Sequence, residues 1–273
     1  MSNKTIIILV SVVGVLAAGI FGYFRMSNQP VEVVQVMPPS QNVAFAPDIE
    51  LVPQFELPER TVQERAIQNK FIALRNQIGN DDIVGHIRID GTTIDYPVVQ
   101  GDDNSFYLYR DINRNMNVAG SIFLDYENDL LRYDRNTIIY GHNMNRNHKF
   151  HAIRFFYDRD FLERHRFITF DTIYGNQTFE IFAFYDTHIS FDYIRVHFAN
   201  DDDFMRLVNE MKRRCIHNLG VEVGPNDRIL TLSTCTNVHM DTRLVINAKL
   251  VSYTPYIPVT NNSDIQELRS MLD

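Results

Sequence analysis

The residues of this chain that are best suited to chemistry are a thiol and a guanidinium near its C-terminal end. Cys235 closes the run TLSTC at 231–235, and Arg243 follows it after a short polar loop, 236–242. A free thiol has a pKa of about 8.5 and reacts at neutral pH only when a base or cation lies close to it. A guanidinium stays charged and donates hydrogen bonds to a carbonyl oxygen that gains negative charge. The pair therefore indicates nucleophilic attack by Cys235 on a carbonyl group.

The residues before Cys235 show the alternation of a β-strand. Leu230 and Leu232 point to one face, whereas Thr231, Ser233 and Cys235 point to the other, which is of mixed polarity. A small cysteine is also a common core residue, and an arginine on the polar face of a strand is common at a surface. Both of these structural interpretations stay open on the local pattern alone.

His142 is the candidate base that the reactive thiol requires. It ends the apolar run that begins at Ile138, shares a face with Ile138 and Tyr140, and enters a polar loop. A strand-end histidine that merely caps a loop is the structural alternative, and His239 is a competing base within the loop 236–242.

A zinc site is a further alternative for His142. It lies close in sequence to His148 and His151, but these spacings match no tight metal template, and no acidic or thiol ligand completes the set nearby. The sequence therefore predicts neither a metal nor a cofactor.

Strand signals dominate the region that must position these residues. Several of the apolar runs follow one another without a helix between them, and Asp90-Gly91 and Tyr174-Gly175-Asn176 are turn signals. The pattern predicts a mainly β fold with inserted helices, a mixed and mainly antiparallel barrel rather than a doubly wound sheet. The candidate strands are 83–90, 92–100, 120–126, 136–142, 167–172, 177–187, 228–235 and 243–253.

Two helices are predicted beside the strands. The first follows a capping box at Thr61 and Glu64 and closes at Gly79. The second runs over 200–218 and has Asn200 at its start and a basic last turn, with Cys215 on its apolar face. Cys215 is therefore predicted to be a core residue, which favours two free thiols over a Cys215–Cys235 disulfide.

The N-terminal region reads as a membrane anchor and a spacer. Thr5 to Phe24 is a run of 20 residues without a charge, long enough to span a bilayer, and a cleaved signal peptide is the alternative. Residues 26–58 hold six of the ten prolines and no basic residue, which predicts an extended linker. The expected organisation is an anchor at 1–25, an extracellular linker at 26–58, a catalytic domain at 59–255 and a tail at 256–273.

The overall charge limits the partners. The 273 residues carry a net charge of −8, which speaks against nucleic acid as the main partner. The chain also lacks a glycine-rich phosphate loop and any evident internal repeat.

Taken together, TLSTC with a downstream arginine, YGHNM at 140–144 and an N-terminal anchor resemble the sortases, membrane-bound cysteine transpeptidases of Gram-positive bacteria. The resemblance covers roughly 59–253. The serine in TLSTC, the segment GSIFLDY at 120–126, the N-terminal helix and the long helix before the cysteine strand are similar to class B.

The resemblance implies a closed eight-stranded β-barrel in which Cys235 is the nucleophile, His142 the general acid and base, and Arg243 the stabiliser of the transition state. Ser233 and Thr234 are implied to contact substrate. The implied reaction cleaves a Thr–Gly or Thr–Asn type bond in the C-terminal sorting signal of a surface protein. The resulting thioester is then transferred to an amine of a peptidoglycan precursor. The implied location is the cell membrane, crossed once by Thr5–Phe24, with the catalytic domain outside the cell.

Other functions remain open at this point. A pilus-type polymerising sortase, a thiol peptidase that mainly hydrolyses and an inactive peptide-binding domain share the same features. The chain order, with His142 before Cys235, is opposite to that of papain-like enzymes. The stretches at 145–148 and 236–242 match no motif of the family, so the peptide preference is not predicted.

Overall fold

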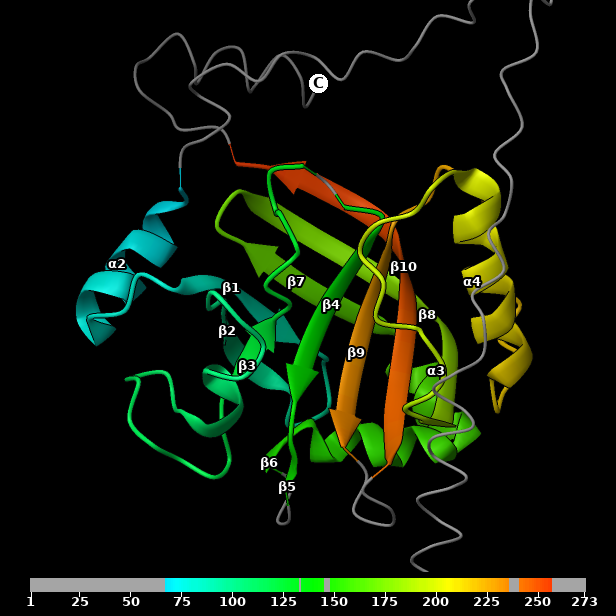
Figure 1. Cartoon of the computed structure of the whole chain (residues 1–273), viewed down its shortest axis with the longest axis horizontal. Coiled ribbons are helices and arrows are strands. Elements are labelled where there is room, and N and C mark those ends of the chain that lie inside the picture. Colours follow the sequence, from blue (N-terminus) through cyan, green and yellow to red (C-terminus); the bar gives the residue numbers. More distant parts are fainter. Residues whose placement is uncertain (1–66, 133, 145–147, 236–240, 257–273) are drawn as a thin grey trace, which may run out of the picture. The chain divides into compact units, whose positions relative to one another are not determined.

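The computed structural model describes residues 67–132, 134–144, 148–235 and 241–256. They form eight barrel strands, two further strands of two residues each, three α-helices and two 3₁₀ segments (Figure 1). In chain order the elements are α2 (Asn69–Ile78), β1 (Ile83–Arg88), β2 (Asp95–Val99), η2 (Tyr107–Tyr109), β3 (Ile122–Leu124), β4 (Asn136–Gly141), β5 (Asn143–Met144), β6 (His148–Lys149), η3 (Phe150–Tyr157), α3 (Arg159–Arg164), β7 (Phe167–Thr172), β8 (Gly175–His188), α4 (Asp201–Arg214), β9 (Ile229–Cys235) and β10 (Thr242–Pro255).

The strands close into a barrel in the order β1-β2-β3-β4-β9-β10-β8-β7. Pairing is antiparallel except between β2 and β3 and between β4 and β9, which run parallel. The predicted eight-stranded, mainly antiparallel barrel is therefore confirmed. Because β4 and β9 are parallel, they need a long connection, and it carries β5 to β8 and α4.

Alternation along the strands divides the apolar residues between the interior and the outside of the barrel. Leu230 and Leu232 of β9 join the interior cluster, whereas Ile229 packs with residues of α4. Burying one such leucine stabilises the fold by about 1.5–3 kcal/mol. The predicted alternation before Cys235 is thus correct, and the face that carries Thr231 and Ser233 is the outer one.

The helix α4 confirms the second predicted helix at its start and corrects its end. The side-chain oxygen of Asn200 accepts a hydrogen bond from the backbone N–H of Asp203 at 2.9 Å. The helix stops at Arg214, and Cys215 takes an extended backbone as its C-cap. The thiol of Cys215 donates to the carbonyl of His217 at 2.8 Å. Cys215 is free, so no disulfide joins it to Cys235.

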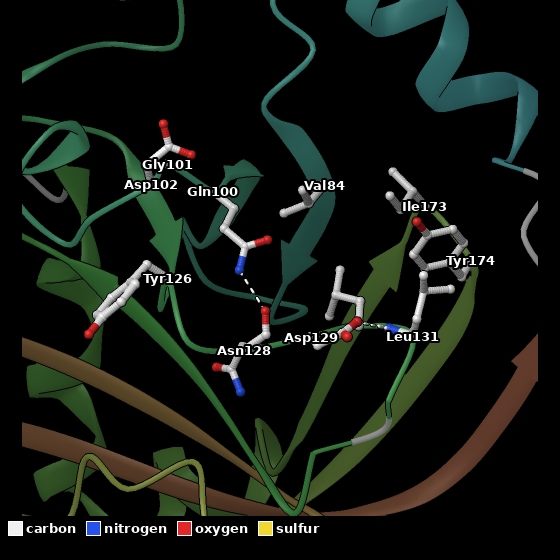
Figure 2. A pocket seen from close by; sticks show the side chains of 11 residues that line it. Val84, Gln100, Gly101, Asp102, Tyr126, Asn128, Asp129, Leu131, Ile173 and Tyr174 are labelled. Carbon is white, nitrogen blue, oxygen red and sulfur yellow. Dashed lines mark hydrogen bonds between the residues drawn. The ribbon is translucent and has the colours of Figure 1, made fainter. Parts of the chain in front are cut away.

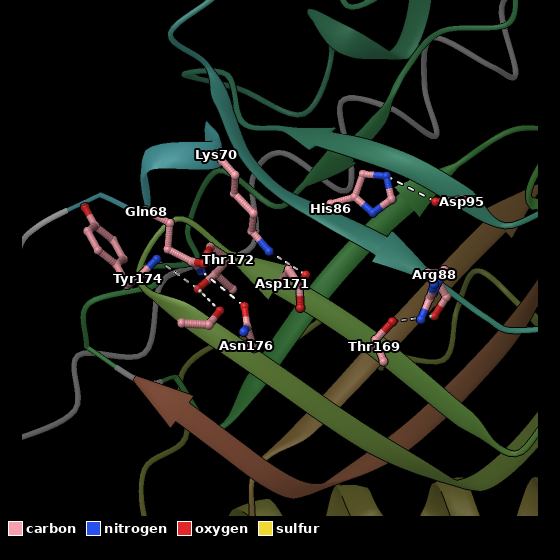
Figure 3. A network of polar contacts seen from close by, with 11 residues as sticks. Gln68, Lys70, His86, Arg88, Asp95, Thr169, Asp171, Thr172, Tyr174 and Asn176 are labelled. Carbon is pink, nitrogen blue, oxygen red and sulfur yellow. Dashed lines mark hydrogen bonds and ion pairs between the residues drawn. The ribbon is translucent and has the colours of Figure 1, made fainter. Parts of the chain in front are cut away.

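The helix α2 is tied to the barrel by polar side chains (Figure 3). Gln68 donates its amide to the carbonyl of Thr172 at 2.6 Å, and Lys70 pairs with Asp171 at 2.6 Å. Gly79 ends the helix in the left-handed conformation with a φ of 75°, as its sequence position predicts. The proposed capping box at Thr61 and Glu64 lies outside the described residues.

The turn between β7 and β8 differs from the prediction. Thr172 pairs directly with Gly175, so the turn is made by Ile173 and Tyr174. Gly175 instead lies in β8, where a Cβ atom would stand 2.6 Å from the carbonyl oxygen of Thr254. The glycine therefore permits close approach to β10 rather than forming the turn.

The membrane localisation predicted from the sequence is corrected. None of the helices in the described residues is long and apolar enough to cross a membrane. The longest of them, α4, has 14 residues, which gives about 21 Å against about 30 Å of bilayer hydrocarbon. The segment Thr5–Phe24, like the linker 26–58 and most of the tail 256–273, lies outside the described residues.

Candidate active site

The three residues predicted to carry the chemistry meet at one end of neighbouring strands. In the antiparallel pair of β9 and β10, Cys235 lies opposite Arg243. In the parallel pair of β4 and β9, Gly141 lies opposite Thr234, so His142 and Cys235 are the next residues at the same end. Three segments far apart in the sequence are thus joined by backbone pairing.

Gly141 is required by the packing immediately before His142. A Cβ atom at this position would lie 2.5 Å from the Cδ1 atom of Ile122 and 2.7 Å from the ring of Phe150. Any larger residue would push β4 away from these buried side chains, and His142 would move with it. The glycine in YGH therefore sets where the histidine leaves the strand.

The imidazole of His142 has a defined hydrogen bond. Its Nε2 atom lies 2.8 Å from the carbonyl oxygen of Leu108. A carbonyl oxygen only accepts, so Nε2 must carry the hydrogen, and Nδ1 is the nitrogen left to exchange a proton. The ring of Tyr109 lies beside it, 6.1 Å between centroids. The backbone of η2 therefore orients the imidazole of His142. No sequence pattern indicated this contact.

Arg243 begins the return strand at a half-buried position. One of its terminal nitrogens donates to the carbonyl of Thr242 at 2.8 Å. This contact holds the guanidinium near the strand end, and a guanidinium is a planar group with five N–H donors in all.

A cavity of about 480 Å³ lies at this strand end. Its wall contains His142 and Arg243, together with Ser233 and Thr234, the two predicted substrate contacts. Ser233 and Thr234 are themselves only 4% and 2% exposed. The other lining residues are Asn104, Leu108, Phe123, Tyr140, Gly141, Ile189, Phe191, Asp192, Tyr193 and Ile194.

One wall of the cavity comes from the connection between β8 and α4. The hydroxyl groups of Tyr193 and Ser233 are 2.8 Å apart and share a hydrogen bond. The amide of Asn136 donates to the carbonyl of Arg195 at 3.0 Å and to that of Tyr193 at 3.4 Å, and its oxygen accepts from Thr231 at 2.7 Å. Asn136 is fully buried and thus binds the connection to β9. We call residues 189–194, held by Asn136 and Ser233, the amide-held wall.

Another part of the lining depends on a carboxylate. Asp125, just after β3, accepts hydrogen bonds from the hydroxyl of Tyr140 at 2.6 Å and from the amide of Asn104 at 2.9 Å. Burial, and secondly the bond to Asp125, raise the pKa of Tyr140 far above its usual value, so the phenol stays protonated and donates. We call Asn104 and Tyr140, held by Asp125, the carboxylate-held wall.

The other candidate residues do not join this cavity. The ring of His151 bonds the side chain of Asn143 at 2.9 Å. Burial, and then the charge of Arg154, lower the pKa of His151. Among the described residues no three His, Cys, Asp or Glu side chains gather as a metal site requires. His239 lies outside the described residues.

The barrel thus brings a cysteine, a histidine and an arginine to one end of three neighbouring strands. Comparison with known proteins gives the family: the model of the sortase domain matches residues 87–251. The chain belongs to the sortase family and is a cysteine transpeptidase of that type. Two relatives called sortase B are each 40% identical to it over 63% of this chain and 71% of their own length. One is from Staphylococcus aureus and the other from Listeria monocytogenes.

Solved structures agree with this assignment. A sortase B–substrate complex from Staphylococcus aureus has a TM-score of 0.65 and 38% identity, covering 70% of this chain and 88% of that one. Sortase B from Clostridium perfringens gives a TM-score of 0.63 and 36% identity, covering 67% of this chain and all of its own. The predicted resemblance to class B sortases is thereby confirmed.

Proposed function

We propose that this protein cleaves a C-terminal sorting signal at a Thr–Gly or Thr–Asn type bond and transfers the new carboxyl end to an amine of the cell wall. In this proposal Cys235 is the nucleophile, His142 the acid and base, and Arg243 the oxyanion donor. The clients are surface proteins that carry the signal, and the acceptor is an amine of a peptidoglycan precursor.

In the first half-reaction, Nδ1 of His142 takes the thiol proton of Cys235, and the resulting thiolate attacks the threonine carbonyl carbon, so that the carbonyl oxygen becomes negatively charged. The guanidinium of Arg243 donates hydrogen bonds to that oxygen. When the peptide bond breaks, Nδ1 of His142 gives its proton to the leaving amine, and a thioester on Cys235 remains.

In the second half-reaction, the acceptor amine attacks the thioester carbonyl. His142 removes a proton from the amine through the same nitrogen, and Cys235 leaves as a thiolate. Nδ1 thus both donates and accepts the proton, which agrees with the hydrogen bond that occupies Nε2 at the carbonyl of Leu108.

The observation that supports this proposal most is the strand register. Cys235 faces Arg243 across one strand pair, and His142 stands at the matching end of the other neighbour of β9. One of the similar solved structures is a sortase B–substrate complex from Staphylococcus aureus. This likeness supports a substrate of the same class for the present chain.

The test is a search for the thioester. The full chain is incubated with fluorogenic sorting-signal peptides, with and without a soluble amine such as triglycine, and Cys235 is inspected by mass spectrometry. We expect an acyl adduct of the peptide on Cys235 and a ligated product when the amine is present. Cleavage with an unmodified Cys235 would contradict the mechanism.

The chain offers a matched control in its second thiol. Cys215→Ser removes a free thiol at the end of α4, outside the cavity lining, and should retain activity. Cys235→Ala should abolish cleavage. Equal rates in the two variants would refute the role given to Cys235, and hydrolysis that the amine never diverts would favour a peptidase.

A further inference from the structure

Asp125 is a buried carboxylate that the proposed mechanism does not use. Its side chain is 4% exposed, and among the buried polar residues of the described chain it is the one with an ionisable side chain. Removing a carboxylate from water costs several kcal/mol unless strong hydrogen bonds replace the lost hydration. Packing alone would not require a charged side chain at this position. The hydrogen-bond partners of Asp125 therefore indicate its role.

The groups of the described residues that donate to the two oxygens of Asp125 are all neutral. One oxygen accepts from the hydroxyl of Tyr140 at 2.6 Å and from the amide of Asn104 at 2.9 Å. The other accepts from the backbone N–H of Glu127 at 2.9 Å. Hydrogen bonds to an ionised acceptor are about twice as strong as neutral ones. Both side-chain donors line the catalytic cavity.

The backbone of Asp125 is fixed as firmly as its side chain. Its N–H donates to the carbonyl of Ile138 at 2.9 Å, which anchors it to β4. Its carbonyl accepts from the side chain of Gln100 at 2.9 Å, and the same amide reaches the carbonyl of Asn128 at 2.7 Å. Gln100 and Asn128 line a second cavity of about 510 Å³ (Figure 2). The carboxylate therefore has little freedom to follow its partners if they move.

We propose that Asp125 is a positioning residue for the peptide-binding cavity: it orients Asn104 and Tyr140 so that they face the sorting signal. This inference rests on the proposed function, because it assigns the cavity to the peptide. The group touches no reacting atom itself. Its effect reaches the substrate through the two side chains it holds.

The arrangement of donors makes the charge necessary. Asn104 donates through its amide nitrogen to Asp125 and accepts through its oxygen from the N–H of Tyr126 at 3.1 Å. An asparagine at 125 would aim an N–H group either at the amide nitrogen of Asn104 or at the N–H of Glu127. Rotating the side-chain amide of Asn104 by half a turn would remove the first of these clashes. Its nitrogen would then face the backbone N–H of Tyr126. Each arrangement leaves one N–H group facing another donor, and the groups at Asn104 and Glu127 are only partly reached by solvent.

The test compares Asp125→Asn with the wild-type full chain. We expect KM for a fluorogenic sorting-signal peptide to rise about ten- to a hundredfold because one wall of the binding site is misplaced. Alkylation of Cys235 by iodoacetamide, followed by mass spectrometry, should keep its wild-type rate because the strand-end groups are unchanged. Tyr140→Phe should raise KM in the same direction, and the double variant should lose less than the product of the two effects.

A control separates positioning from loss of stability. Gln68→Ala removes a buried amide that bonds Thr172 and Asn176 and lines neither cavity. It should lower the melting temperature and leave KM unchanged. The inference is overturned if Asp125→Asn raises KM no more than Gln68→Ala, or if the alkylation rate falls in step with kcat/KM.

Two further outcomes remain decisive. If Asp125→Asn does not fold, Tyr140→Phe and Asn104→Ala carry the test, and an unchanged KM in both overturns the inference. If the wild-type chain is alkylated at Cys235 but forms no thioester with sorting-signal peptides, the proposed function itself fails, and the inference built on it fails with it. That result would be visible without any variant.

Discussion

The two walls of the candidate active-site cavity are built on different principles. The carboxylate-held wall places Asn104 and Tyr140 on one buried charge, whereas the amide-held wall rests on Asn136, which makes neutral hydrogen bonds to backbone carbonyls. A charge holds side chains strongly but must be desolvated. An amide holds backbone with weaker bonds and no charge to desolvate.

Because the two walls are held differently, substitutions near them should have different effects. Changes near Asp125 should act on how the peptide is oriented, because they move side chains. Changes near Asn136 should act on the stability of the whole wall, because they release a connection that has no regular secondary structure between β8 and α4. His142, Cys235 and Arg243 belong to neither wall. Substitutions of these strand-end residues should have larger effects than substitutions in either wall.

The largest effect is expected at Arg243. Arg243→Ala should lower kcat/KM about 10²- to 10³-fold, the usual loss when an oxyanion donor is removed. Peptide cleavage measured at low substrate concentration checks this value. Arg243→Lys should recover part of the rate, since a point charge replaces the fork of donors. If Arg243→Ala kept the wild-type rate, the main contribution to kcat/KM would come from the two walls and not from this guanidinium.

The next effect concerns the amide-held wall. Asn136→Ala should lower the free energy of unfolding by about 2–4 kcal/mol, because Thr231 and two backbone carbonyls lose a buried partner. Urea unfolding monitored by circular dichroism measures this change. Thr169→Ala, an exposed hydroxyl on β7 and far from the cavity lining, is the matched control and should change stability by less than about 0.5 kcal/mol. Equal stability of the two variants would show that the wall does not depend on Asn136.

A smaller effect is expected at Tyr193. Tyr193→Phe removes the hydroxyl that bonds Ser233 and keeps the ring. Because both partners are neutral, we expect a loss of about 1 kcal/mol in stability. A drop in kcat/KM beyond about tenfold, measured beside Asp125→Asn, would mean that this wall orients the peptide as strongly as the other one.

The smallest effect is a pH dependence at the start of α4, beyond the amide-held wall. The N–H of Ala199, and then Arg195, lower the pKa of Asp203 below 3.8 in the folded protein. A lowered folded-state pKa stabilises the fold above pH 3.8, and this contribution disappears as the pH falls from 3.8 through the folded-state pKa. Melting curves of wild type and Asp203→Asn between pH 3 and 6 should therefore converge at the acid end. Curves that stay parallel would contradict the prediction.

Much of the barrel could be predicted because its signals are local. All eight predicted strands are present, Asn200 caps α4 and Gly79 ends α2, since alternation and capping are written in neighbouring residues. The end of α4 was missed because Cys215 and His217 bond each other in an extended backbone. The closeness of Cys235 and Arg243 was expected from two strands joined by a short loop, whereas joining His142 to them followed from the family resemblance.

The supporting groups of the site could not be predicted because they act over long sequence distances. The carbonyl that orients His142 belongs to Leu108, and a carbonyl leaves no mark in the sequence. Tyr193 lies in a connection without periodicity, and it meets Ser233 through the tertiary fold alone. Asp125 lay in a segment that resembled class B sortases, but its burial was visible in the structure only.

Closure of the barrel also limits how a peptide can be recognised. Every strand of the barrel has a neighbour on both sides, so the barrel offers no open edge to which an extended peptide could add as a further strand. Main-chain ladder hydrogen bonds along a free edge strand, which would read any sequence equally, are therefore not offered by these eight strands. Discrimination between peptides must come from side chains and loops at the strand ends, which can change while the barrel stays the same.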